Sequence, residues 1–234
     1  MEKSAKWILL SITMLLLAAC TPDEAQDNSD EALPTNSSNE DGNAGFTSSE
    51  RDASSTLIVY YSLPETGGVD AVAGSSRVVN DGEVVGNTQQ VAYWAEEQTG
   101  ADLFQIETVA EYPGDHDELV EQGTEEHEND SRPEIADYID NIDDYETILF
   151  GHPIWLADLP SPVYSFLEDV DFSDKTIIPF STHGGNAVTD TKETIADLQP
   201  QAEVDIDNGL TISRDDVPEA RQEVNDWLTQ IGFE

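Results

Sequence analysis

From residue 56 onward, short runs of mostly β-branched and aromatic residues alternate with segments whose apolar residues recur every three or four positions. The apolar runs predict five strands, at residues 56–61, 102–106, 145–150, 175–180 and 203–206, the last of which could extend to residue 210. The other segments predict helices at residues 87–99, 162–170, 189–198 and 216–231, whereas the acidic segment 111–134 has weak helical character at best. Such alternation is typical of an α/β protein with a parallel sheet and helices on both faces.

The first 20 residues follow a different pattern. Lys3 and Lys6 precede an apolar run too short to span a bilayer comfortably, and Leu-Ala-Ala then leads to Cys20. This ending resembles the bacterial lipobox, where the signal peptide is cut before a cysteine that becomes lipidated. The resemblance implies a lipoprotein signal peptide over residues 1–20 and a lipid-anchored protein on the extracytoplasmic face of the cell membrane. An ordinary signal peptide, or a buried helix with an accidental cysteine, is the alternative.

Residues 21–55 are rich in Ser, Asn, Asp, Glu, Gly and Ala and contain almost nothing that a core could bury. Such a segment cannot offset the entropy lost on ordering. We therefore predict a disordered acidic tether over residues 21–55, followed by one folded domain over residues 56–234.

The charge balance is extreme, with 9 Lys and Arg against 50 Asp and Glu and a formal net charge of −41. A surface of this kind repels nucleic acid and anionic lipid headgroups, so we expect neither as a ligand. Salt would screen the self-repulsion, which suggests a halotolerant protein. The single cysteine excludes an intrachain disulfide, and the four histidines show no metal-ligand spacing, so we predict no metal site.

Ligands of parallel α/β folds bind beyond the carboxyl ends of the strands. The first strand ends in Tyr-Tyr-Ser at Ser62, and Gly86, Asn87 and Thr88 open the following helix. Joined, these segments read Y-Y-S-x-x-G-N-T, which resembles the phosphate-binding loop of flavodoxins. The resemblance implies that all four residues hold the phosphate of FMN at a helix N-terminus. Alternatively, Asn87 or Thr88 is only a helix cap.

An insertion of residues 65–85 separates the two halves of this loop. It could cover a flavin, add backbone N–H donors, or destroy the site. Arg77 is the only cation in the insertion, and it could reach a phosphate or form a surface salt bridge among the many acids.

Two further loops extend the resemblance to the flavodoxin family. Gly-His-Pro-Ile-Trp follows the third strand and resembles the G-Y-P-I-W segment that runs along the isoalloxazine ring, which implies ring contacts from Pro153, Ile154 and Trp155. His152 could also line the ring. The alternative is a turn at Pro153 with Trp155 in the core.

The loop after the fourth strand is Ser-Thr-His-Gly-Gly-Asn, which resembles the family's loop at the edge of the flavin ring. This implies contacts from Thr182, His183, Gly184 and Gly185, and His183 could hydrogen-bond a flavin carbonyl or help to move protons. The alternative is a tight turn before a helix. The two glycines would let backbone approach a ligand closely.

Taken together, the three loops imply a flavodoxin-like, doubly wound, five-stranded parallel sheet in the order 2-1-3-4-5 with FMN as the cofactor. The function expected from the resemblance is electron transfer with a redox partner protein or small-molecule acceptor whose identity the sequence does not give. A flavin-dependent reductase of a small acceptor and a flavin-free surface interaction module are the alternatives. Because the surroundings are acidic, we expect a bound flavin to have a low midpoint potential.

Overall fold

A computed structural model describes residues 51–66, 77–80, 82–185, 187 and 189–233, all within one compact unit, Phe46–Glu234. The expected signal peptide, Cys20 and most of the expected tether lie outside the described residues. So do residues 67–76 of the insertion. Within the described part of the chain, no helix is long and apolar enough to span a bilayer.

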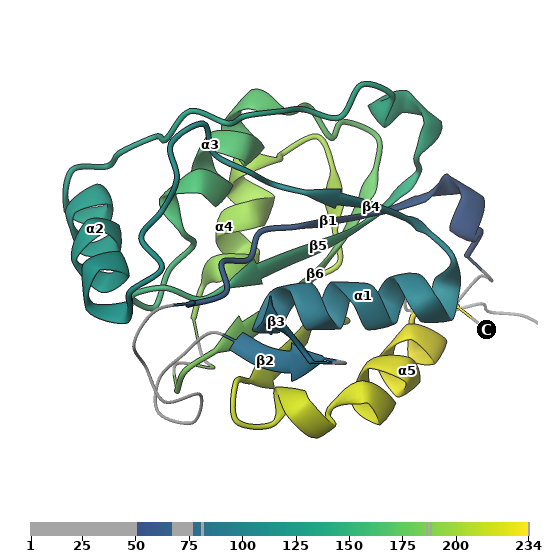
Figure 1. The fold of residues 1–234 in the computed structure, drawn as a ribbon. Helices are drawn as coiled ribbons and strands as arrows, with labels where there is room; N and C mark the ends of the chain where they lie inside the picture. Colours follow the sequence, from purple (N-terminus) through teal and green to yellow (C-terminus); the bar gives the residue numbers. More distant parts are fainter. Residues whose placement is uncertain (1–50, 67–76, 81, 186, 188, 234) are drawn as a thin grey trace, which may run out of the picture. The chain divides into compact units, whose positions relative to one another are not determined.

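A parallel sheet forms the centre of the fold (Figure 1). Its strands are β1 (Thr56–Tyr60), β4 (Asp102–Gln105), β5 (Thr147–Pro153), β6 (Thr176–His183), β7 (Glu203–Val204) and β8 (Leu210–Ser213). The order is β4-β1-β5-β6-β7, and β8 also pairs with β6. The predicted order 2-1-3-4-5 is therefore confirmed, with β7 and β8 sharing the fifth position.

The split of the fifth strand is a difference from the sequence-based prediction. Between β7 and β8, the Asp205 carboxylate accepts hydrogen bonds from the backbone N–H of Asn208 at 3.2 Å and from its side-chain amide at 2.9 and 3.0 Å. This local bonding favours a turn over continued strand pairing. The chain then pairs with β6 a second time: β8 lies along the carboxyl half of that strand, from Phe180 to His183.

Helices cover both faces of the sheet. They are α1 (Asn87–Thr99), α3 (Ser161–Asp169), α4 (Thr191–Leu198) and α5 (Arg221–Gln230). Side chains of β1 alternate between two cores: Ile58 and Tyr60 pack with α1 and α5, whereas Leu57 and Val59 pack with α3 and α4. This alternation explains why the whole of β1 is buried and why it is apolar from Leu57 to Tyr60.

The four predicted helices are present: α1 has the predicted bounds, and the other three have shifted ends. The predicted helix at residues 216–231 begins as a short 3-10 helix, Val217–Glu219, and α5 follows it. The expectation of weak helical character over residues 111–134 is wrong, because α2 (His116–Glu128) forms a regular helix there. The Asp115 carboxylate caps α2 by accepting from the N–H groups of Asp117 and Glu118, and acidic side chains in the first turn suit the helix dipole.

The last part of the insertion forms an antiparallel hairpin of β2 (Arg77–Asn80) and β3 (Glu83–Gly86), which runs directly into α1. Val78 and Val85 face each other across the hairpin and join the core beneath α1 and α5. Gly82 adopts a φ of 88° in the tight turn, where a residue with a side chain would be strained.

Residues 51–55, at the end of the predicted tether, make hydrogen bonds to the folded domain. The backbone N–H of Arg51 donates to the Gly232 carbonyl at 2.9 Å. Its guanidinium donates to the Ile231 carbonyl at 2.7 Å and to the Thr147 hydroxyl at 3.2 Å. These bonds attach the segment to the C-terminal end of the domain, and residues Ala53–Ser55 form a 3-10 helix before β1.

Candidate functional site

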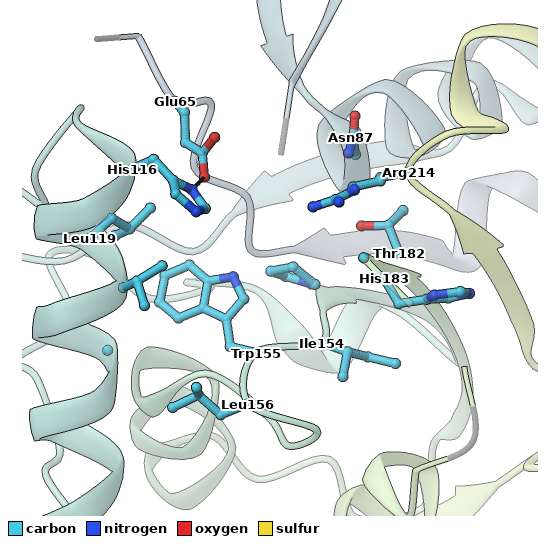
Figure 2. Close-up of a pocket in the computed structure, with 14 residues that line it drawn as sticks. Glu65, Asn87, His116, Leu119, Ile154, Trp155, Leu156, Thr182, His183 and Arg214 are labelled. Atoms are coloured by element: carbon cyan, nitrogen blue, oxygen red, sulfur yellow. Dashed lines mark hydrogen bonds and ion pairs between the residues drawn. The ribbon is translucent and has the colours of Figure 1, made fainter. Parts of the chain in front are cut away.

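A cavity of about 190 Å³ lies beyond the carboxyl ends of the central strands (Figure 2). Its walls come from the loop after β1, the start of α1, one side of α2, the loop after β5, the end of β6 and the residue after β8. Of the residues expected to bind a flavin, the cavity is lined by Asn87, Pro153, Ile154, Trp155, Thr182, His183 and Gly184.

One side of the cavity is apolar and aromatic. The Trp155 indole contacts the rings of Tyr61 and Tyr112 edge to face, with centroid separations of 5.8 and 6.2 Å. On α2, a side chain at Gly123 would place its Cβ 3.5 Å from the Trp155 ring, so the helix backbone lies close to the indole. Neighbouring apolar lining residues are Leu119, Val120, Ile154 and Leu156.

The opposite side is polar. The Thr182 hydroxyl is 2.8 Å from the Thr88 hydroxyl, which connects the end of β6 to the first turn of α1. The Nδ1 atom of His183 accepts the N–H of Gly185 at 3.1 Å. Partial burial lowers the pKa of His183, which favours the neutral imidazole at neutral pH.

Both glycines after β6 have a structural reason to be glycine. At Gly184, a Cβ would lie 2.9 Å from a terminal nitrogen of Arg214, so a side chain there would displace the guanidinium. Gly185 does not line the cavity and has a φ of 128°, a conformation that side-chain-bearing residues rarely adopt.

The insertion leaves the two halves of the expected phosphate loop in contact. The Ser62 hydroxyl accepts the N–H of Gln89 at 3.2 Å, and the Gln89 side chain accepts the N–H of Gly86 at 3.0 Å. A Cβ at Gly86 would lie 3.1 Å from the Ser62 Cβ and closer still to its hydroxyl. Ser62, Gly86 and Thr88 therefore gather at the start of α1 just outside the cavity lining, and Asn87 faces the cavity.

Asn87 carries an unsatisfied polar atom. Its side chain is 2% exposed, and its Oδ1 atom has no hydrogen-bond partner among the described residues. Buried acceptors without a partner are rare and call for an explanation. Asn87 also lines the cavity, where Figure 2 shows its amide nitrogen on the cavity side and its oxygen turned away.

Two residues considered for the site lie elsewhere. His152 is fully buried and does not line the cavity, because alternation along β5 turns its side chain into the protein. Arg77 also does not line it, and its guanidinium donates to the Glu65 carbonyl at 2.8 Å. The structure thus places neither the His152 nor the Arg77 side chain in the cavity lining.

Three features of the cavity escaped the sequence analysis: Arg214, the α2 wall, and a pair formed by the partly exposed His116 and the buried Glu65. The Glu65 carboxylate is 2.8 Å from Nδ1 of His116, the first residue of α2. Arg214 follows β8 directly, so the rule that ligands bind beyond the carboxyl ends of strands could have found it. No comparable pattern in the sequence predicts the contact of Glu65 with α2. Among the described residues, no group of three or more His, Cys, Asp or Glu side chains could hold a metal ion.

The strand order, the helices on both faces and the three loops around the cavity define a flavodoxin-like α/β protein. A family model described as flavodoxin matches residues 78–231, which is more than half of the chain. The protein therefore belongs to the flavodoxin family. No curated protein matches the chain.

Two solved structures with TM-scores above 0.5 show the same fold. A candidate flavoprotein from Bacteroides eggerthii is 21% identical, with a TM-score of 0.55 over 76% of this chain and 98% of its own. A candidate flavoprotein from Bacteroides uniformis is 22% identical, with a TM-score of 0.55 over 74% of this chain and 97% of its own. A flavoprotein from Lactobacillus acidophilus in complex with FMN is 20% identical, with a TM-score of 0.47 over 74% of this chain and 98% of its own.

Proposed function

We propose that this protein binds FMN in the cavity and transfers electrons at the outer face of the cell membrane, to which lipidated Cys20 anchors it. The observation that carries the proposal is the contact between the two halves of the predicted phosphate loop. Although the insertion separates them in sequence, Ser62 and the start of α1 are in hydrogen-bonding contact. First-turn N–H groups of a helix lack intrahelical partners and suit a phosphate dianion. The lipid anchor rests on the lipobox pattern alone.

The two walls of the cavity match different parts of FMN. Its apolar wall, with Trp155 and Ile154, suits the flat ring system, and its polar wall, with Thr182 and His183, suits the ribityl chain. The volume of about 190 Å³ is below the roughly 300–1,000 Å³ typical of pockets that enclose a whole small molecule. The cavity would therefore hold part of the cofactor, and the remainder would lie along the surface.

FMN would supply one- or two-electron chemistry, while the protein binds it, positions it and sets its electrostatic surroundings. Because Nδ1 of His183 accepts the N–H of Gly185, the neutral imidazole would carry its proton on Nε2 and could donate a hydrogen bond at the ring edge. The electron donor and acceptor would be a redox partner protein or a small molecule outside the cytoplasm.

The shape of the cavity mouth favours one alternative, a flavin-dependent reductase of a small acceptor. Val120 and Leu156 line the cavity and are also 46% and 48% exposed. Apolar side chains at an open mouth would contact an uncharged, apolar acceptor lying beside the ring. An FMN-loaded protein that is reoxidised by a small quinone much faster than by a redox protein would favour the reductase.

A fluorescence titration of the chain from Thr21 onward with FMN, with riboflavin as the control, tests the proposal. Tight quenching of FMN and weak quenching of riboflavin are expected. Thr88→Ala should weaken FMN binding because Thr88 lies at the proposed phosphate site, whereas Thr229→Ala, on the exposed side of α5, should not. A folded protein that binds neither flavin would refute the proposal and favour a flavin-free surface interaction module.

A further inference from the structure

One cationic side chain stands apart in the described part of the chain. Arg214 lines the cavity, and no other described Lys or Arg does. Figure 2 shows its side chain extending into the cavity between Asn87 and Thr182. In a chain with a net charge of −41, a cation on the wall of a cavity is an unusual choice of residue.

The position of Arg214 is fixed by the backbone on which it stands. Its N–H donates to the His183 carbonyl at 2.8 Å, which continues the pairing of β8 with β6 by one residue. The side chain then passes over Gly184, where even a methyl group would approach the guanidinium to 2.9 Å. Because Gly184 has no side chain, the Arg214 guanidinium can occupy this space.

Arg214 also lacks the close carboxylate partner that other arginines of this chain have. Arg132 donates through Nε to both oxygens of Glu168, at 2.8 and 2.9 Å, and through a terminal nitrogen to Asp130 at 2.9 Å. Arg214 is instead 3.8 Å from the carboxylate of Asp215, whose side chain is 76% exposed. An ion pair that long and that exposed contributes little, so the guanidinium remains able to bind an anion.

We propose that Arg214 binds the phosphate of FMN and makes the site select phosphorylated flavin over riboflavin. This inference rests on the proposed function. The planar guanidinium can donate two parallel hydrogen bonds to a phosphate, and such charge-assisted pairs are the stronger hydrogen bonds in proteins. Asn87 at the N-terminus of α1 lines the same cavity, so the positive end of the helix dipole and the guanidinium face the same space.

Equilibrium titrations of wild type, Arg214→Gln and Arg214→Lys with FMN and with riboflavin test the inference. Arg214→Gln is expected to weaken FMN binding by about 10- to 100-fold and to leave riboflavin binding unchanged. Arg214→Lys should lie between, because it keeps the charge and loses the paired donors. Arg221→Gln is the matched control: its partner Glu97 lies on the surface, and neither flavin should bind differently.

Inorganic phosphate gives a second readout that does not depend on the flavin ring. It should compete with FMN for wild type and lose most of this effect for Arg214→Gln. An unchanged ratio of FMN to riboflavin affinity in Arg214→Gln would overturn the inference and leave FMN binding intact. Equal weakening of both flavins would also overturn it, because it would place Arg214 against the ring. A wild-type protein that binds neither flavin would overturn the proposed function itself, and this inference with it.

Discussion

The buried histidine of β5 should make the stability of this domain depend on pH in a way that one substitution removes. His152 is 0% exposed; its Nδ1 is 3.2 Å from the Pro153 carbonyl, and its Nε2 has no partner among the described residues. Burial lowers the pKa of His152 to about 4, and the positive charge of Lys192 acts in the same direction. The folded protein therefore holds His152 as a neutral imidazole at neutral pH.

The direction of the effect follows from proton binding. In the unfolded chain, the pKa of His152 returns to about 6.5. Between that pH and about 4, His152 is therefore protonated in the unfolded state and neutral in the folded state. The free energy of unfolding therefore falls as the pH falls from about 6.5 towards 4. Integrating this proton linkage gives a loss of about 2 kcal/mol between pH 7 and 5, and of about 3 kcal/mol by pH 4.

Urea unfolding of wild type and His152→Phe at several pH values between 7 and 4 measures this loss. Phenylalanine has a similar shape, does not titrate, and removes the unsatisfied Nε2. The 50 acidic residues contribute to both curves, so the difference between the curves isolates His152. Parallel curves for His152→Phe and wild type would refute the reasoning.

Three other predictions concern packing, charge and potential. Gly151→Ala should lower the free energy of unfolding in urea by about 1–3 kcal/mol, because a Cβ there would overlap the buried ring of Phe180. Gly123→Ala, in the middle of α2, would make contacts at ordinary distances and should be neutral or stabilising by up to about 1 kcal/mol. Equal effects of the two substitutions would contradict this reasoning. Stopped-flow association of FMN should become faster with added NaCl because the dianion and the protein repel each other, whereas neutral riboflavin should show no such change. The midpoint potential of bound FMN should lie below that of free FMN, and Arg214→Gln should lower it further; a spectroelectrochemical value at or above that of free FMN would be inconsistent with the acidic surroundings acting on the flavin.

The central sheet could be predicted from the sequence because burial on both faces leaves a strong local pattern. Every residue of β1 is apolar or β-branched and buried, and such a run reads as a strand without tertiary information. α2 was underestimated for the opposite reason. Only Leu119 of this helix is buried, so its apolar pattern is weak, and its cap at Asp115 and its contact near Trp155 are what favour it.

The loops of the site could be found, but not how they meet. The segments Tyr-Tyr-Ser and Gly-Asn-Thr predict a phosphate loop. Whether the insertion of residues 65–85 keeps the two segments together depends on where the hairpin β2–β3 returns the chain. The hydrogen bond between Ser62 and Gln89 brings the two segments together, and it becomes visible only in the folded structure. Arg214 was missed for a similar reason: its direction is set by the pairing of β8 with β6 and by the missing side chain at Gly184.

The charge of this chain and the charge of its proposed cofactor oppose each other, but they act over different distances. Repulsion between a surface of net charge −41 and a phosphate dianion extends over about 10 Å at 0.1 M salt, and it slows the approach of FMN. Arg214 acts only on contact, inside the cavity, so it should slow the escape of FMN. Salt should therefore change mainly the association rate, and Arg214→Gln mainly the dissociation rate. Because the two effects are separable, an acidic surface can coexist with selective binding of an anion.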